Sequence, residues 1–141
     1  MKEREGSMKK LFFVFALLSV LSACGGGAAS PKTDLKVTLT DFQYIPNQFT
    51  VPAGQEITLE AVNNGGVVHN FIIMNLGQTV GTEYTAEDDA NVYWKLEMPI
   101  GSSTDTTFTA PTEPGEYEVV CSTPGHVQAG MVGKLVVVVG E

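Results

Sequence analysis

Alternation of apolar and polar residues at every second position is the feature of this sequence that most limits its fold. In "KVTLTDF", Val37 and Leu39 alternate with polar side chains, and in "EITLEAV" the residues Ile57, Leu59 and Ala61 do the same. A period of two places one face of a strand against a core and the other face in solvent. The chain therefore predicts half-buried β-strands over these segments.

Turn-forming residues separate the alternating runs at short intervals. "PAG" at 52–54 and "PTEPGE" at 111–116 supply the proline and glycine that tight turns require. This spacing predicts an all-β fold, a two-sheet Greek-key β-sandwich of about seven or eight strands. The apolar run at 133–140 is typical of a strand that is covered on both sides or ends the sheet. Only 80–92 lacks strand character, and it predicts a short helical flap with Thr85 as its cap.

The first residues have the composition of a secretory signal. Two lysines precede "LFFVFALLSVLSA" at 11–23, an apolar core shorter than the roughly 20 residues that a transmembrane helix needs. We therefore expect residues 1–23 to be a signal peptide that is absent from the mature protein. Translation from Met1 or from Met8 would give the same mature chain.

The end of this signal, "LSAC", resembles the lipobox of bacterial lipoproteins. The resemblance implies cleavage before Cys24, a diacylglycerol on its sulfur, and a lipid-anchored, extracytoplasmic protein on the periplasmic or cell-surface side of a membrane. The alternative is a plain secretory signal with an incidental cysteine. "GGGAASPKTD" follows, so residues 24–34 read as a lipidated cysteine with a flexible tether. Residues 35–141 then form the globular domain.

The charge of the chain limits its partners. The 141 residues carry a net charge of −8, and the signal region holds four basic and two acidic groups, so the mature chain carries −10. An acidic domain argues against nucleic acid and against electrostatic adhesion to anionic lipid. Its length suits one domain.

The cysteine and histidine counts narrow the chemistry. The chain has two cysteines, and if Cys24 carries lipid, Cys121 has no disulfide partner. A lone thiol outside the cytoplasm is open to oxidation unless something such as a metal occupies it. With two histidines in all, no second, histidine-rich copper centre can be built. A hydrolase using Cys121 and His126 would lack a nucleophile elbow.

Four side chains form a candidate metal site. His69 lies on the apolar face of "VVHNFIIM", and Cys121 falls on the inward face at the end of another strand. A histidine on an apolar face is by itself more often structural, but strand ends at one pole of a sandwich can meet. Together with His126 and Met131, these residues offer two imidazoles, a thiolate and a thioether. That set matches a blue-copper site, whereas zinc usually takes a harder ligand, thiolate or water in fourth place.

Four segments carry a resemblance to a known family. They are "FTVPAGQEITLEAVNN", "VHNFIIM", "FTAPTEPGEYEVVCSTPGH" and "GMVGKLVVVV", and together they span most of residues 41–140. These segments resemble the cupredoxins, the small blue copper proteins, and their ligand spacing is most similar to the azurin, auracyanin and rusticyanin branch.

The resemblance implies a set of site residues. The ligands of one type 1 copper ion would be His69, Cys121, His126 and, as the weak axial ligand, Met131. Asn70 resembles the asparagine that ties the ligand loop to the strand. In some cupredoxins the carbonyl group just before the first histidine also approaches the copper, which here would be Val68.

The resemblance also implies a function. Cupredoxins shuttle single electrons by Cu(I)/Cu(II) cycling, which predicts an electron carrier and not an enzyme, monomeric, with cytochromes or membrane respiratory or photosynthetic complexes as partners. We expect an edge of the His126 ring to reach the surface inside a small apolar patch, formed by Pro124, Val127, Ala129 and Val132. Two alternatives are a copper storage or delivery module and an accessory copper domain of a terminal oxidase or reductase.

Overall fold

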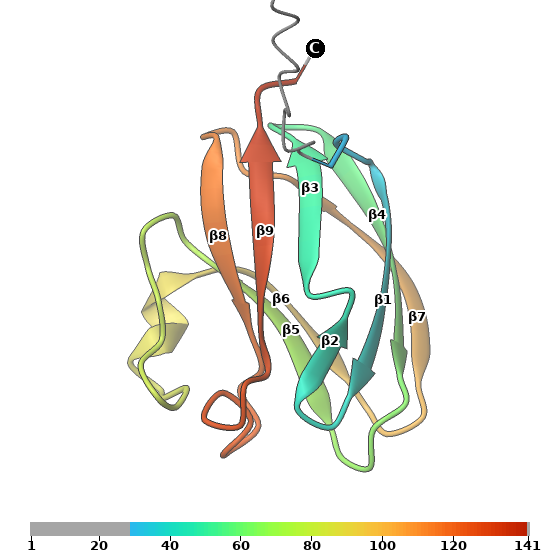
Figure 1. Cartoon of the computed structure of the whole chain (residues 1–141), viewed down its shortest axis with the longest axis vertical. Coiled ribbons are helices and arrows are strands. Elements are labelled where there is room, and N and C mark those ends of the chain that lie inside the picture. The colour runs from blue at the N-terminus through green and yellow to red at the C-terminus, as the bar shows by residue number, and fades with distance from the viewer. Residues whose placement is uncertain (1–28, 141) are drawn as a thin grey trace, which may run out of the picture.

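The computed structural model describes residues 29–140, which form two β-sheets packed face to face (Figure 1). The strand orders are β2-β1-β4-β7 and β3-β9-β8-β5-β6. The elements are β1 (Asp34–Thr40), β2 (Gln43–Ile45), β3 (Gln48–Pro52), β4 (Glu56–Asn63), β5 (His69–Met74), the 3-10 helix η1 (Asp88–Asn91), β6 (Val92–Met98), β7 (Ser103–Thr109), β8 (Gly115–Val120) and β9 (Val132–Val138). The predicted all-β sandwich is confirmed.

The period-two alternation explains how the first sheet packs. Val37 and Leu39 of β1, with Ile57, Leu59 and Ala61 of β4, are at most 2% exposed. The two strands run parallel and side by side, with Val37 opposite Ala61. Their apolar side chains therefore share one face, and burial of that face drives the sheet onto its partner.

The described residues form nine strands, where the sequence predicted seven or eight. One reason is that the chain changes sheet soon after β1. β2 pairs with β1, whereas β3 pairs in parallel with β9 in the other sheet. Pro46 lies between β2 and β3 and has no N–H to donate to a sheet ladder, so two short strands form in place of one.

Strand β9 lies inside its sheet, between β3 and β8. Leu135 and Val137 are buried, and the residues that alternate with them on the outer face are half-buried. The unbroken apolar run thus marks a strand paired along both edges and fully covered on one face only.

The predicted flap near 80–92 contains one short helical turn, η1. Its N-cap is Glu87, which makes no capping bond through its side chain. Thr85 is therefore not the cap that the sequence predicted. Its N–H and hydroxyl both donate to the carboxylate of Asp88, at 2.7 and 3.0 Å, because a carboxylate in the first turn is a stronger acceptor than a hydroxyl.

Aromatic rings fill the centre of the sandwich. Phe71 of β5 packs edge-on against Tyr44, Phe49 and Trp94, with ring centroids 5.5–6.5 Å apart. Trp94 stacks on Phe108 of the other sheet at 4.9 Å. Such contacts add to the burial energy and hold the two sheets at a fixed spacing.

The two ends of the sandwich differ in what they carry. The loop between β8 and β9 and the turn between β1 and β2 lie at one end, and the described chain enters at the other, near the end of β9 (Figure 1). The predicted signal peptide and Cys24 lie outside the described residues. Among the residues described, no helix is long and apolar enough to cross a membrane.

Candidate metal centre

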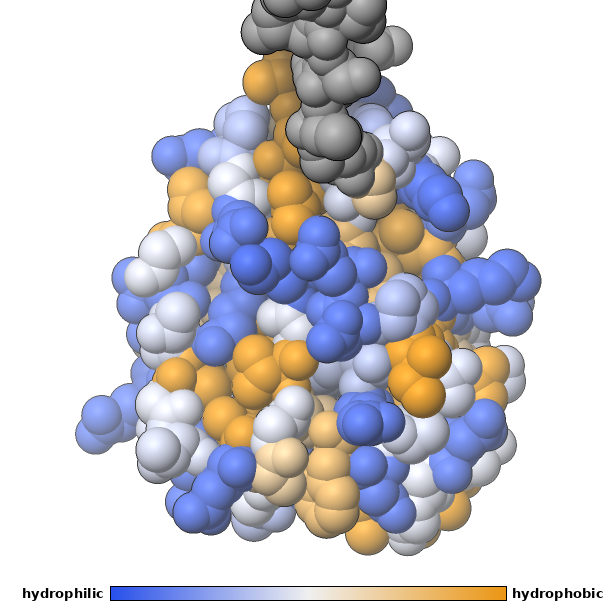
Figure 2. All heavy atoms as spheres, viewed as in Figure 1, coloured by the Kyte–Doolittle hydropathy of each residue, from blue (hydrophilic) through white to orange (hydrophobic). Residues whose placement is uncertain are grey.

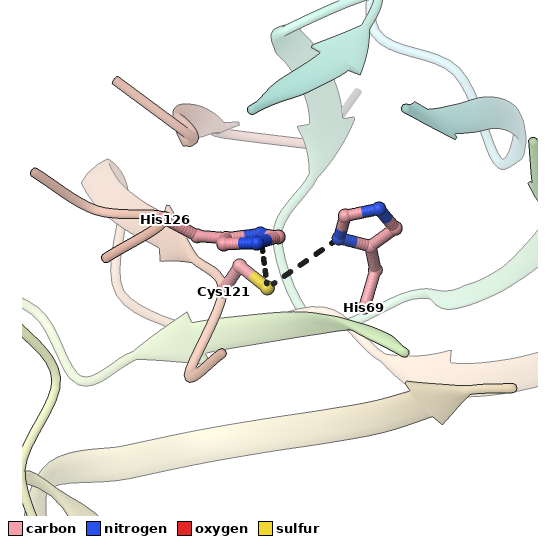
Figure 3. Close-up of side chains that lie close together, drawn as sticks. All are labelled: His69, Cys121 and His126. Carbon is pink, nitrogen blue, oxygen red and sulfur yellow. Dashed lines mark hydrogen bonds between the residues drawn. The ribbon is translucent and has the colours of Figure 1, made fainter. Parts of the chain in front are cut away.

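Three predicted ligands meet at the end of the sandwich that carries the β8–β9 loop (Figure 3). His69 is the first residue of β5, Cys121 follows β8 directly, and His126 lies in the loop before β9. The Sγ atom of Cys121 is 3.9 Å from Nδ1 of His69 and 3.8 Å from Nδ1 of His126. Within residues 29–140 this is the one group of three or more such side chains placed to hold a metal.

Strand pairing brings His69 to Cys121. β5 and β8 are antiparallel, with Ile72 opposite Val120, so the start of β5 lies beside the end of β8. The backbone N–H of Asn70 donates to Sγ of Cys121 at 3.4 Å. This hydrogen bond helps to fix the position of the sulfur atom.

The ligand loop is held in a compact turn by its own backbone. The N–H of Met131 donates to the carbonyl of His126 at 2.8 Å, and the N–H of Ala129 donates to the carbonyl of Gly125 at 3.0 Å. Gly125 and Gly130 have φ values of 79° and 100°, a region that favours glycine. Met131 is fully buried in the same core cluster as Cys121.

Asn70 supports the site through its main chain. Besides its N–H bond to the thiol, its carbonyl accepts a 2.6 Å hydrogen bond from the hydroxyl of Tyr44. Burial and then the neighbouring Cys121 raise the pKa of Tyr44 well above its usual value, so the phenol stays a donor. Among the described residues, the side chain of Asn70 has no hydrogen-bond partner.

The carbonyl of Val68 has a protein partner. It accepts a 2.7 Å hydrogen bond from the hydroxyl of Thr123 in the ligand loop. This contact links the entrance of β5 to the loop that carries His126, and it occupies one lone pair of the carbonyl oxygen.

Burial suits the three side chains to metal binding. His69 and Cys121 are fully buried and His126 is 6% exposed. Burial, followed by the nearby His69, lowers the pKa of His126, so its neutral form, with a free nitrogen lone pair, is favoured. Cys121 is a free thiol among the described residues.

Two further residues at the site were not singled out from the sequence. The Oδ1 atom of Asp41 lies 3.1 Å from Nε2 of His69, and the ring of Phe42 meets the ring of His126 with centroids 5.0 Å apart. Asp41 and Phe42 form the two-residue turn between β1 and β2, and Phe42 has a φ of 69°. A non-glycine residue at this φ is uncommon, and no local sequence pattern reveals it.

Asn63 is a third residue missed, because "NNGG" reads as an ordinary turn. It is fully buried. Its side-chain amide donates to the carbonyls of Val67 and Met98, both at 2.9 Å, and its Oδ1 accepts from the N–H of Gly65 at 2.8 Å. Asn63 therefore fixes the loop that leads into His69.

The donor set and its spacing fit a copper ion. Metal bonds to imidazole nitrogen and thiolate sulfur are about 2.0–2.3 Å long, so donors separated by 3.8 and 3.9 Å can share one ion that lies off the line between them. Two imidazoles and a thiolate beside a buried thioether are the ligands of blue-copper sites.

Residues 31–138 match the family described as copper binding proteins, plastocyanin/azurin family. The chain is a cupredoxin. It belongs to the blue copper proteins, which carry one type 1 copper, and its class of function is electron transfer. The family resemblance inferred from the sequence is confirmed.

Similar proteins support this assignment. The cupredoxin is 32% identical to auracyanin-A of Chloroflexus aurantiacus, over 92% of this chain and 96% of that protein. It is 29% identical to the copper-resistant cuproprotein CopI of Rubrivivax gelatinosus, over 79% of this chain and 70% of that protein. Its fold is similar to a crystal structure of auracyanin from Roseiflexus castenholzii, with a TM-score of 0.65 and 27% identity, covering 77% and 99% of the two chains.

Substitution of Gly65 tests how tightly the loop packs on His69. A Cβ atom at Gly65 would lie 2.2 Å from Nε2 of His69 and 2.6 Å from Oδ1 of Asp41. Gly65→Ala should therefore displace the imidazole, weaken copper binding at least tenfold, and lower the free energy of unfolding by about 1–3 kcal/mol. Copper titration and urea unfolding measure both effects.

Gly66→Ala is the matched control, because its nearest neighbour, Oδ2 of Asp41, would lie 3.4 Å away. Equal copper affinity in the two variants would show that the loop yields to His69 and that the close packing has no role.

Proposed function

We propose that this cupredoxin is a membrane-anchored electron carrier whose copper is held by His69, Cys121 and His126, with Met131 as the axial ligand. The observation that carries the proposal is the buried cluster of two imidazoles and one free thiol within 4.8 Å. Bound copper supplies the one-electron Cu(I)/Cu(II) couple. The rest of the function depends on how the chain holds its ligands and presents them to partners.

The ligands sit on rigid elements. His69 begins β5 and Cys121 directly follows β8, which pairs with β5. The His126 loop is held by hydrogen bonds at Met131 and, through Thr123, at Val68. Groups fixed in this way change position little when the charge at the site changes. That rigidity favours rapid electron transfer over metal exchange.

His126 gives a route to the surface. Only a small part of its ring is exposed, and Phe42, which is nearly half exposed, packs on it. We infer that electrons enter and leave at this edge.

Apolar side chains surround this end of the molecule. Val67 and Val68 precede His69, and Ile100 follows the strand end that pairs with it. Pro124 and Ala129 of the predicted patch are exposed, but Val127 packs into a second core cluster and does not belong to it. Figure 2 shows apolar side chains at the surface towards the lower end of the molecule, among polar ones. A redox protein could dock here through a small, short-lived contact.

We propose an extracytoplasmic protein anchored through lipid on Cys24. The lipobox-like "LSAC" supports this. The described chain enters the domain at the end opposite the β8–β9 loop (Figure 1). A tether of this kind would leave the metal end free to meet cytochromes or membrane redox complexes, and confinement raises the effective concentration of both partners.

A copper-handling role is the second candidate, because the relative CopI is described as a copper-resistant cuproprotein. A storage or delivery module must release its metal. Fast copper loss to a chelator, together with slow electron exchange, would favour that role over electron transfer.

Replacement of the thiol tests the copper assignment. The oxidised wild type should be intensely blue, because thiolate-to-copper charge transfer absorbs visible light, and Cys121→Ser should abolish the colour. Absorption and EPR spectra of the copper-loaded protein provide the measurement. A colourless wild type containing Cu(II) would refute the proposal.

Met131→Leu tests the axial position. The variant should remain blue but have a higher reduction potential, because a weak axial donor that stabilises the oxidised ion is lost. A redox titration measures the shift, and a lower potential would contradict the axial role.

Val67→Ser tests the docking surface. It should slow electron self-exchange between copies of the protein severalfold, because apolar contact area is lost, and leave the absorption spectrum unchanged. Val139→Ser is the matched control, since Val139 is exposed just beyond β9, at the opposite end. Equal self-exchange rates in both variants would argue against docking near His126.

Cys24→Ser tests the anchor. The wild type should sediment with membranes, and the variant should appear in the soluble extracytoplasmic fraction, because the thiol that accepts the lipid is absent. Fractionation with an antibody to the domain measures this. Retention of the variant on membranes would show that lipid on Cys24 is not the anchor.

A further inference from the structure

Asp41 contacts a ligand from a part of the chain that supplies no ligand itself. It is the first residue of the turn between β1 and β2, 28 positions before His69. Its Oδ1 lies 3.1 Å from Nε2 of His69 and accepts a 3.0 Å hydrogen bond from the N–H of Gly66. One carboxylate oxygen therefore joins the turn, the β4–β5 loop and the imidazole.

This contact bears on which nitrogen of His69 carries the proton. An ionised carboxylate only accepts hydrogen bonds, so the Nε2 atom that faces Asp41 must be the donor. A neutral imidazole protonated at Nε2 has its lone pair on Nδ1. Nδ1 is the atom that lies 3.9 Å from Sγ of Cys121, so the hydrogen bond leaves the metal-facing nitrogen free.

The arrangement has little room for an alternative. Gly65 packs so closely that a Cβ there would collide with both Nε2 of His69 and Oδ1 of Asp41. The N–H of Gly65 also donates a hydrogen bond to the buried side chain of Asn63. The Asp41 side chain is 50% exposed, so solvent screens its charge in part.

The neighbouring residue supports a role for the whole turn. Phe42 adopts a φ of 69°, which L-residues rarely do, and its ring packs on His126. Each residue of the β1–β2 turn thus contacts one of the two histidines. Unfavourable backbone conformations persist where the surroundings hold them in place for function.

We propose that Asp41 is a positioning residue that holds His69 in its Nε2–H tautomer and lowers the reduction potential of the site. A carboxylate that accepts a hydrogen bond from Nε2 makes an imidazole a more basic ligand. A more basic, partly anionic ligand favours Cu(II) over Cu(I). The part of the proposal that concerns potential rests on the proposed function. The part that concerns the tautomer does not need the metal.

The metal-free protein tests the tautomer. Long-range 1H–15N NMR of the imidazole rings should show His69 protonated at Nε2 in the wild type. Asp41→Ala removes the acceptor and should give a mixture of the two tautomers. Asp41→Asn keeps an acceptor oxygen without the charge and should keep Nε2–H. An Nδ1–H tautomer in the wild type, or an unchanged tautomer in Asp41→Ala, would overturn the proposal.

The copper-loaded protein tests the potential. Loss of an outer partner of a metal-bound histidine typically weakens metal binding about 10–100-fold, so Asp41→Ala should lose Cu(II) affinity by that factor. Asp41→Asn should raise the reduction potential. If the variant loses ten times more affinity for Cu(II) than for Cu(I), its reduction potential rises by about 59 mV.

Asp34→Asn is the matched control. Asp34 is the exposed first residue of β1, and Asp41 lies just beyond the end of that strand. Asp34→Asn therefore changes the net charge equally without touching His69. A potential that rises equally in both variants, or in neither, would overturn the role of Asp41. A wild type without a type 1 copper spectrum would instead refute the proposed function, while the NMR result would still stand.

Discussion

The antiparallel pairing of β5 with β8 is the constraint on which the rest of the site depends. It places the first residue of β5 beside the residue that follows β8, so His69 and Cys121 meet although they are 52 positions apart. The same pairing aims the N–H of Asn70 at the thiol. His126 then needs only a short loop to come back to the sulfur atom.

Hydrogen bonds from side chains to main-chain carbonyls hold the metal end together. Asn63, Thr123 and Tyr44 each bind a main-chain carbonyl next to the site. These bonds satisfy buried polar groups and link three loops to one another. A site built this way resists movement, which suits electron transfer.

The two ends of the domain carry different features. The chain enters at one end of the sandwich, and the β8–β9 loop lies at the other (Figure 1). His69 and His126 lie at this second end. Both features follow from strand lengths and loop positions in a two-sheet fold. The proposed anchor and the proposed docking surface would then lie at opposite ends and not compete for the same face.

The sequence by itself determined the fold class and the four candidate ligands. Period-two alternation is a local pattern, and few metals suit a set of two histidines, one cysteine and one methionine. The extra strand, the role of Asn63 and the contacts of Asp41 and Phe42 could not be predicted in this way. Each joins segments distant in the chain, and an aspartate or an asparagine in a turn has the same local pattern whether it faces solvent or a ligand. Only the tertiary structure, by packing the β1–β2 turn against the histidines, decided which of these polar residues belong to the site.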